Sequence, residues 1–304
     1  NPQSGCIAIK PIELVADLPP AIVEFETYEI CDNTSRNFDL NIINSMIVNN
    51  DSDAIISYYF NEFDAEGNLN AISTDYNYTT TNDTIYIRIE SASRGCHYVY
   101  PFQLIVNPLP ISNQPNDIEV CDDESADGFE IIRLSSINST ILGEQNPDDF
   151  TVSYYDNSSS ANNGMSSLTE YYNTQNGQTI YARTENNRTG CYSTTQFNTI
   201  VHLYPNNVTP LIQCDVDYDQ TVVFDISSNE NNLFSTPTNN IIVSYYDDLD
   251  LIDDDTSALN DPVNYANLSQ TQTIYIKVFN ISANCYNIVN QELIVTSPPS
   301  IPPS

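Results

Sequence analysis

Two kinds of side chain in this 304-residue chain occur at spacings that could support chemistry: seven cysteines and several runs of aspartate. Cysteines form disulfides or, as thiolates, bind a soft metal such as zinc. No two cysteines lie close together in the sequence, which makes a metal site the weaker interpretation. Disulfides are favoured over free thiols, and they indicate a compartment outside the cytoplasm.

The cysteines reveal an internal repeat of about 90 residues. One series stands at positions 31, 121 and 214, and the other stands at positions 6, 96, 191 and 285. Each member of the second series follows Gly or Asn, and a Thr-Ile-Tyr triplet begins 12 residues before Cys96, Cys191 and Cys285. A proline lies 14 residues after each member of that series. Fixed spacing of this kind is the signature of a tandem array.

One disulfide in each repeat is the simplest pairing that the two series allow. It predicts the bonds Cys31–Cys96, Cys121–Cys191 and Cys214–Cys285. In the chain-entropy model each would stabilise its repeat by roughly 3–5 kcal/mol. Cys6 is left unpaired in this segment, since its partner would lie upstream.

Alternating side chains predict short strands in every repeat. Ile85, Ile87 and Ile89 share one face of such a strand, and Arg88 belongs to the opposite face, which we expect to meet solvent. A short helical turn is expected near residues 41–47. Strands separated by turn residues in units of this length predict an all-β chain of tandem immunoglobulin-like antiparallel sandwiches, arranged as an extended rod.

The repeat sets the expected domain boundaries. The chain starts without Met, so we expect an excised segment in which residues 1–20 are the last strand of a truncated repeat. The complete repeats then span 21–110, 111–206 and 207–299, and 300–304 form a proline-rich linker.

Acidic loops follow two cysteines of the first series and are candidate calcium ligands, because calcium takes six to eight oxygens. The alternative is an acidic loop that water alone solvates. The candidate ligands are Asp122, Asp123, Asp127, Asp215, Asp217 and Asp219. The third repeat lacks the glycine and the final glutamate of a helix-loop-helix calcium loop, so that motif fails.

Charge and missing motifs exclude several functions. The formal net charge is −33, which repels nucleic acids and anionic lipid. No apolar run is long enough to span a membrane. Neither of the two histidines has a catalytic partner pattern, and the nucleophile elbow and the phosphate loop are both missing, so we predict no enzyme.

The recurring pattern resembles the tandem repeats of large Bacteroidota surface proteins exported by the type IX secretion system. The resemblance rests on Cys31, the Phe-Asp-Leu at 38–40, the Ser-Tyr-Tyr at 57–59, the segment 84–90 and the Gly-Cys at 95–96, with their copies. It covers nearly the whole chain. The third repeat departs from it, with Lys277 in place of arginine. The resemblance implies an extracellular stalk or adhesin related to gliding motility.

These observations together predict a structural segment of a repeat-built bacterial surface protein. Its expected partners are neighbouring repeats, identical chains in a filament, or surface glycans. The alternative is a set of polysaccharide-binding modules, in which exposed tyrosines stack on sugars. No cofactor other than calcium is expected.

Overall fold

The computed structural model describes residues 10–12, 22–48, 52–234 and 240–297. The chain divides into two compact units: residues 1–110 with 185–192, and residues 111–184 with 193–304. Cys6 and the linker at 300–304 lie outside the described residues, as does most of the predicted truncated strand at 1–20. Within the described part of the chain, no helix has the length and apolar character needed to cross a membrane.

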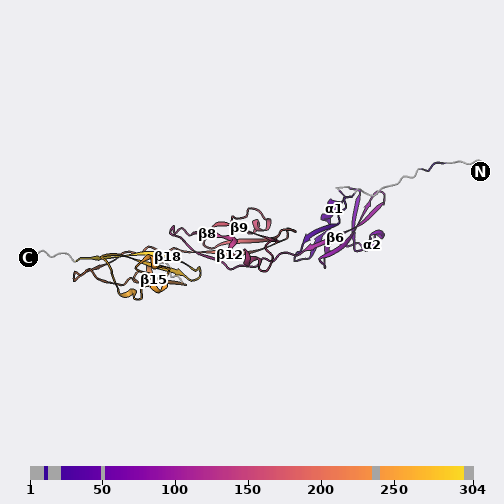
Figure 1. Cartoon of the computed structure of the whole chain (residues 1–304). Helices are drawn as coiled ribbons and strands as arrows, with labels where there is room; N and C mark the ends of the chain where they lie inside the picture. Colours follow the sequence, from indigo (N-terminus) through magenta and orange to yellow (C-terminus); the bar gives the residue numbers. More distant parts are fainter. Residues whose placement is uncertain (1–9, 13–21, 49–51, 235–239, 298–304) are drawn as a thin grey trace, which may run out of the picture. The chain divides into compact units, whose positions relative to one another are not determined.

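Each repeat contains one four-stranded sheet. In the first repeat its strands are β1 (Thr27–Cys31), β3 (Ala54–Tyr59), β5 (Asn82–Ser91) and β6 (His97–Asn107), in the order β1-β6-β5-β3. Figure 1 labels β6, the last of these strands. β5 pairs antiparallel with both β3 and β6, whereas β1 runs parallel to β6. The first strand of the repeat therefore ends level with the end of the last strand.

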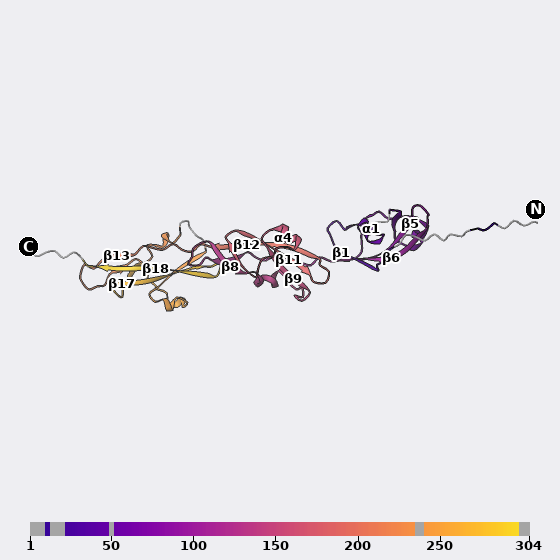
Figure 2. The ribbon, with the colours of Figure 1, turned by 90° about the horizontal axis from the view of Figure 1, so that it is seen from above.

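The other two repeats reproduce this order. The second repeat has the order β7-β12-β11-β9, and the third has the order β13-β18-β17-β15, in which β13, β18 and β17 lie side by side (Figure 2). The strands of the second repeat are β7 (Ile118–Cys121), β9 (Phe150–Tyr155), β11 (Gln178–Asn186) and β12 (Tyr192–His202). Those of the third are β13 (Leu211–Cys214), β15 (Ile241–Tyr246), β17 (Thr271–Asn280) and β18 (Cys285–Thr296).

A two-stranded sheet covers one face of each larger sheet. The pairs are β2 (Asn37–Asp39) with β4 (Asp75–Asn77), β8 (Phe129–Arg133) with β10 (Tyr171–Gln175), and β14 (Val223–Phe224) with β16 (Tyr265–Ala266). Phe38 and Tyr76 from the small sheet join Ile85, Ile87 and Ile89 in one buried cluster. The predicted all-β, immunoglobulin-like sandwich is confirmed, but the first strand of each repeat runs parallel to the last one, where an antiparallel plan was expected.

Short helices fill the connections. The helical turn expected near 41–47 is α1 (Asn41–Ile47), whose Ile43 and Ile47 are buried. α2 (Glu62–Gly67) and α4 (Ser158–Asn163) each follow the Ser-Tyr-Tyr strand, and the side chain of Asn61 or Asn157 caps the first turn. The remaining helices are η1 (Leu134–Ile137), α3 (Asn138–Leu142), η2 (Glu230–Asn232), η3 (Leu249–Leu251), η4 (Asp255–Ser257) and η5 (Pro262–Asn264).

The prediction that Arg88 faces solvent is wrong, because α2 covers that face of the sheet. Arg88 is 6% exposed. Its guanidinium donates to the carbonyl oxygens of Ala65 and Glu66, both at 3.0 Å, and pairs with Glu90. Arg183 donates to the carbonyl oxygens of Ala161 and Asn162, and Lys277 donates to that of Ile252. In each repeat these carbonyls belong to the segment that follows Ser-Tyr-Tyr. A basic side chain at this position thus supplies a donor to buried carbonyls at a helix end.

We expect Arg88→Met to destabilise the first repeat by about 3 kcal/mol, because it removes the guanidinium that pairs with Glu90 and donates to two helix carbonyls. Arg88→Lys is the matched control, since Lys277 reaches the carbonyl of Ile252 from the same position at 2.9 Å. It should cost only about 1 kcal/mol. Chemical denaturation followed by circular dichroism measures both losses, and equal losses would contradict this role for the guanidinium.

Candidate functional site at the junctions between repeats

Two disulfides join cysteines of successive repeats. Cys31 in the first repeat bonds to Cys191 in the second, with 5.4 Å between their Cα atoms. Cys121 in the second bonds to Cys285 in the third, with 6.1 Å between their Cα atoms. The predicted pairings of Cys31 with Cys96, Cys121 with Cys191 and Cys214 with Cys285 are therefore wrong. The prediction of disulfides on Cys31, Cys121, Cys191 and Cys285 is right in kind and wrong in partner.

The length of the last strand explains why Cys31 does not form a disulfide with Cys96 of its own repeat. Cys31 ends β1 level with Asn107 at the end of β6, whereas Cys96 precedes the start of β6. Eleven positions separate Cys96 from Asn107. At about 3.3 Å per residue this distance is about 36 Å, far beyond the roughly 7 Å that a disulfide can span between Cα atoms. The same count separates Cys191 from His202 and Cys285 from Thr296, the residues level with Cys121 and Cys214.

A left-handed residue directly precedes each second-series cysteine that the structure describes, where the chain turns into the last strand. Gly95, Gly190 and Asn284 directly precede Cys96, Cys191 and Cys285, and their φ angles are 74°, 71° and 52°. Glycine adopts this conformation freely, and asparagine is among the few other residues that do so at little cost. The Gly-Cys pairs of the sequence are therefore a conformational requirement of the turn that presents the sulfur.

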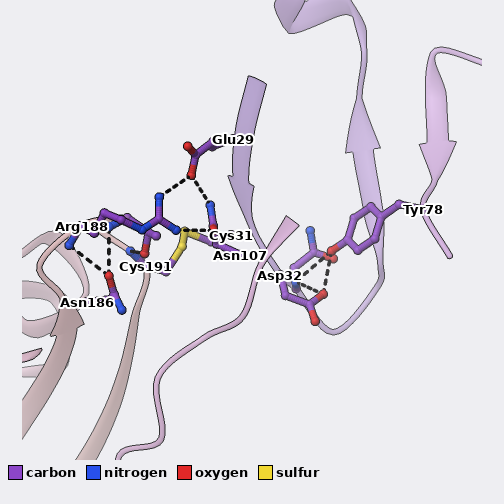
Figure 3. Close-up of a disulfide and its surroundings, with 10 residues drawn as sticks. Glu29, Cys31, Asp32, Tyr78, Asn107, Asn186, Arg188 and Cys191 are labelled. Atoms are coloured by element: carbon purple, nitrogen blue, oxygen red, sulfur yellow. Dashed lines mark hydrogen bonds and ion pairs between the residues drawn. A yellow bond between two sulfur atoms is a disulfide. The ribbon is translucent and has the colours of Figure 1, made fainter. Parts of the chain in front are cut away.

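Polar contacts surround the bond between Cys31 and Cys191 (Figure 3). The Arg188 guanidinium lies 3.2 Å from Glu29 Oε2 and donates to Asn107 Oδ1 at 3.0 Å. Asn107 Nδ2 donates to the same Glu29 oxygen at 2.7 Å. These residues belong to the unit that contains 185–192. The loop that carries Cys191 is thus held by hydrogen bonds as well as by sulfur.

Hydrogen bonds from Asn107 and Arg188 lower the pKa of Glu29. A carboxylate with a lowered folded-state pKa stabilises the fold above its unfolded pKa and loses that contribution as the pH falls through the folded value. We therefore expect Glu29→Gln to lower the melting temperature at neutral pH. Thermal denaturation at decreasing pH should show the two melting temperatures converging in acid. A difference that does not change with pH would contradict the assignment.

The bond between Cys121 and Cys285 has different neighbours, all within one compact unit. Asn287 Nδ2 donates to the carbonyl oxygen of Asp122 at 2.8 Å, and the Tyr204 hydroxyl donates to the carbonyl oxygen of Ile288 at 2.9 Å. Each is a bond between the second and third repeats. Cys96 and Cys214 are not joined to their predicted partners, and Cys214 is an exposed thiol among the described residues.

The structure brings together only some of the candidate calcium ligands. Asp122 and Asp123 lie with Glu130, one oxygen of each within 4.8 Å of the others. Glu130 was not singled out from the sequence, because it lies outside the aspartate run. Asp127 is not in the group, and its Oδ1 accepts a hydrogen bond from the backbone N–H of Phe129.

Asp215, Asp217 and Asp219 form a second group within the same distance. Both oxygens of Asp215 already accept backbone hydrogen bonds, from the N–H groups of Tyr218 and Gln220 at 2.8 Å. A hydrogen bond shared with Asp215 and the charge of Asp219 raise the pKa of Asp217. These contacts show a loop organised around Asp215, and calcium binding here stays a prediction.

Comparison with known proteins gives the family. No curated protein matches the chain. Similar solved structures include an I-band fragment of titin (11% identity, 82% of this chain and 89% of that one, TM-score 0.32) and extracellular domains of Drosophila OTK (8% identity, 92% and 100%, TM-score 0.28). The family model described as "Flavobacterium inter-domain disulphide bond domain" matches residues 27–110, 117–205 and 210–299. The chain therefore belongs to this family, of which it contains three consecutive copies.

Proposed function

We propose that this chain is a structural segment of an extracellular stalk or adhesin, in which disulfides carry tension from one repeat to the next. The observation that supports the proposal is the interleaved order of the bonds. Cys31–Cys191 and Cys121–Cys285 enclose loops that overlap over residues 121–191. The two connections between successive repeats that the structure describes are thus doubled, once by the backbone and once by sulfur.

Disulfides persist in oxidising surroundings, which supports a place outside the cytoplasm. The resemblance to Bacteroidota surface proteins adds type IX secretion and a role in gliding motility or adhesion to the proposal. The formal charge of −33 would keep neighbouring chains apart in solution. The segment would then either project a distal binding domain or form part of a filament.

Cutting the backbone between two repeats tests the proposal. A protease site inserted after Asn207 lies between the matched residues 117–205 and 210–299. After cleavage the two fragments should stay together in non-reducing electrophoresis, because Cys121 and Cys285 lie on opposite sides of the cut. They should separate when a reductant is added.

The control is the same insertion in a Cys121→Ala/Cys285→Ala variant, which should fall into two fragments without reductant. Separation of the wild-type fragments under non-reducing conditions would show that the backbone is the only covalent link across this junction. It would refute the tension-bearing role proposed for the disulfides.

A further inference from the structure

One buried carboxylate oxygen in the second repeat has no hydrogen-bond partner among the described residues. Asp122 is 1% exposed, and its Oδ1 accepts no hydrogen bond. Its other oxygen, Oδ2, accepts a hydrogen bond from the N–H of Gly128 at 3.0 Å. A buried carboxylate needs donors or a positive charge, because burial removes the water that otherwise stabilises its charge.

Two neighbouring carboxylates increase the need for a positive charge at Asp122. One oxygen each of Asp122, Asp123 and Glu130 lies within 4.8 Å of the others. None of the ion pairs found in the described part of the chain includes any of the three. His202, the residue level with Cys121, pairs with Glu119 instead. Three carboxylates at this separation repel one another unless a cation lies among them.

The other repeats satisfy the corresponding aspartate by different means. Asp32 Oδ1 accepts a hydrogen bond from the Tyr78 hydroxyl at 2.9 Å, and both oxygens of Asp215 accept backbone N–H groups. Glu130 lies two residues before Ile132, which pairs with Tyr172 across the small sheet. In the first repeat, Phe38 pairs with Tyr76 at the same place in the small sheet. Arg36 lies two positions before Phe38 and is therefore the residue equivalent to Glu130. The first repeat therefore carries a positive charge where the second carries a negative one.

We propose that Asp122, Asp123 and Glu130 bind one calcium ion. A hard divalent cation would supply Asp122 Oδ1 with a partner and neutralise the repulsion among the three carboxylates. A cavity of about 380 Å³ borders Asp122 and Asp123, although Glu130 does not line it, and water from this cavity would complete the calcium shell. Calcium tolerates such irregular sets of oxygen ligands, whereas magnesium demands strict octahedral geometry.

The site would fasten the loop after Cys121 to strand β8. That loop also contacts the third repeat, since Asn287 donates to the backbone carbonyl of Asp122. Bound calcium would therefore stiffen the segment beside the Cys121–Cys285 bond. The inference does not depend on the proposed mechanical function, because ion binding is measured on the isolated chain.

Isothermal titration of the full chain with calcium chloride tests the site. We expect the wild type to bind calcium, and the ion held by Asp122 and Asp123 to bind at least tenfold more weakly in Glu130→Gln, which leaves Asp122 and its hydrogen bond to Gly128 in place. Asp217→Asn, in the acidic group of the third repeat, is the matched control and should leave the affinity of this ion unchanged. Magnesium chloride at the same concentration should bind more weakly.

Glu130→Arg provides a second variant, because it copies the charge that Arg36 supplies in the first repeat. Its melting temperature should not respond to calcium, whereas that of the wild type should rise. The inference is overturned if the wild type binds no calcium at millimolar concentration, or if binding survives in Glu130→Gln and is lost in Asp217→Asn. Equal binding of magnesium would refute the assignment to calcium.

Discussion

Stretched from residues 22 and 297, the oxidised chain will extend far less than the reduced chain. Without disulfides, 254 positions separate Cys31 from Cys285, and the unfolded chain spans about 900 Å between them at about 3.6 Å per residue. With both bonds intact, the shortest covalent path crosses from Cys31 to Cys191, returns to Cys121 and crosses to Cys285. Only the 70 positions from 121 to 191 can then extend, which gives about 250 Å.

Single-molecule stretching with and without a reductant measures this difference. A variant that lacks only Cys121 and Cys285 should extend to an intermediate length, because the remaining bond still excludes residues 31–191 from the path. Equal extension of oxidised and reduced chains would contradict the interleaved pairing. Pairing within each repeat would give a different extension of the oxidised chain, since only the segments outside the three disulfide-closed loops could then extend.

The second large effect concerns stability. The bond Cys31–Cys191 closes a sequence separation of 160 residues. In the chain-entropy model a loop of this length contributes about 5 kcal/mol, because the cross-link restricts the unfolded chain. We expect Cys31→Ala/Cys191→Ala to lower the free energy of unfolding of the oxidised chain by up to about this amount.

Chemical denaturation of the oxidised proteins measures this loss. Cys214→Ala is the control, because Cys214 is an exposed thiol outside both described disulfides, and it should leave the denaturation midpoint unchanged. A reductant should bring the wild type down to the level of the double variant or below it. A double variant as stable as the oxidised wild type would show that this bond adds nothing to the fold.

Local pattern was sufficient to predict α1 and the strand that contains Ile85, Ile87 and Ile89. Ile85, Ile87 and Ile89 alternate in sequence and are fully buried in the structure. Alternation says which residues share a face, but it does not say what covers the other face. Arg88 was therefore assigned to solvent, although three of the eight basic residues, Arg88, Arg183 and Lys277, occupy this one position of the repeat. In so acidic a chain, that coincidence was the available signal for a structural cation.

The disulfide partners required information about register that spacing alone does not contain. Both cysteine series recur at almost the same interval, so pairing within a repeat and pairing between repeats fit the sequence equally well. The distinction follows from strand direction, because β1 runs parallel to β6 and places Cys31 a full strand length from Cys96. Glu130 lies in β8, three residues beyond the last aspartate of the loop, and sequence alone does not show that its carboxylate returns to Asp122 and Asp123.

Peptide mapping of the oxidised chain by mass spectrometry, without reduction, tests directly whether the disulfides join successive repeats. We expect one linked pair of peptides that contains Cys31 with Cys191, and a second that contains Cys121 with Cys285. Each pair should separate into two peptides on reduction. Peptides that link Cys31 to Cys96, or Cys121 to Cys191, would contradict the covalent connection between successive repeats and the function proposed from it.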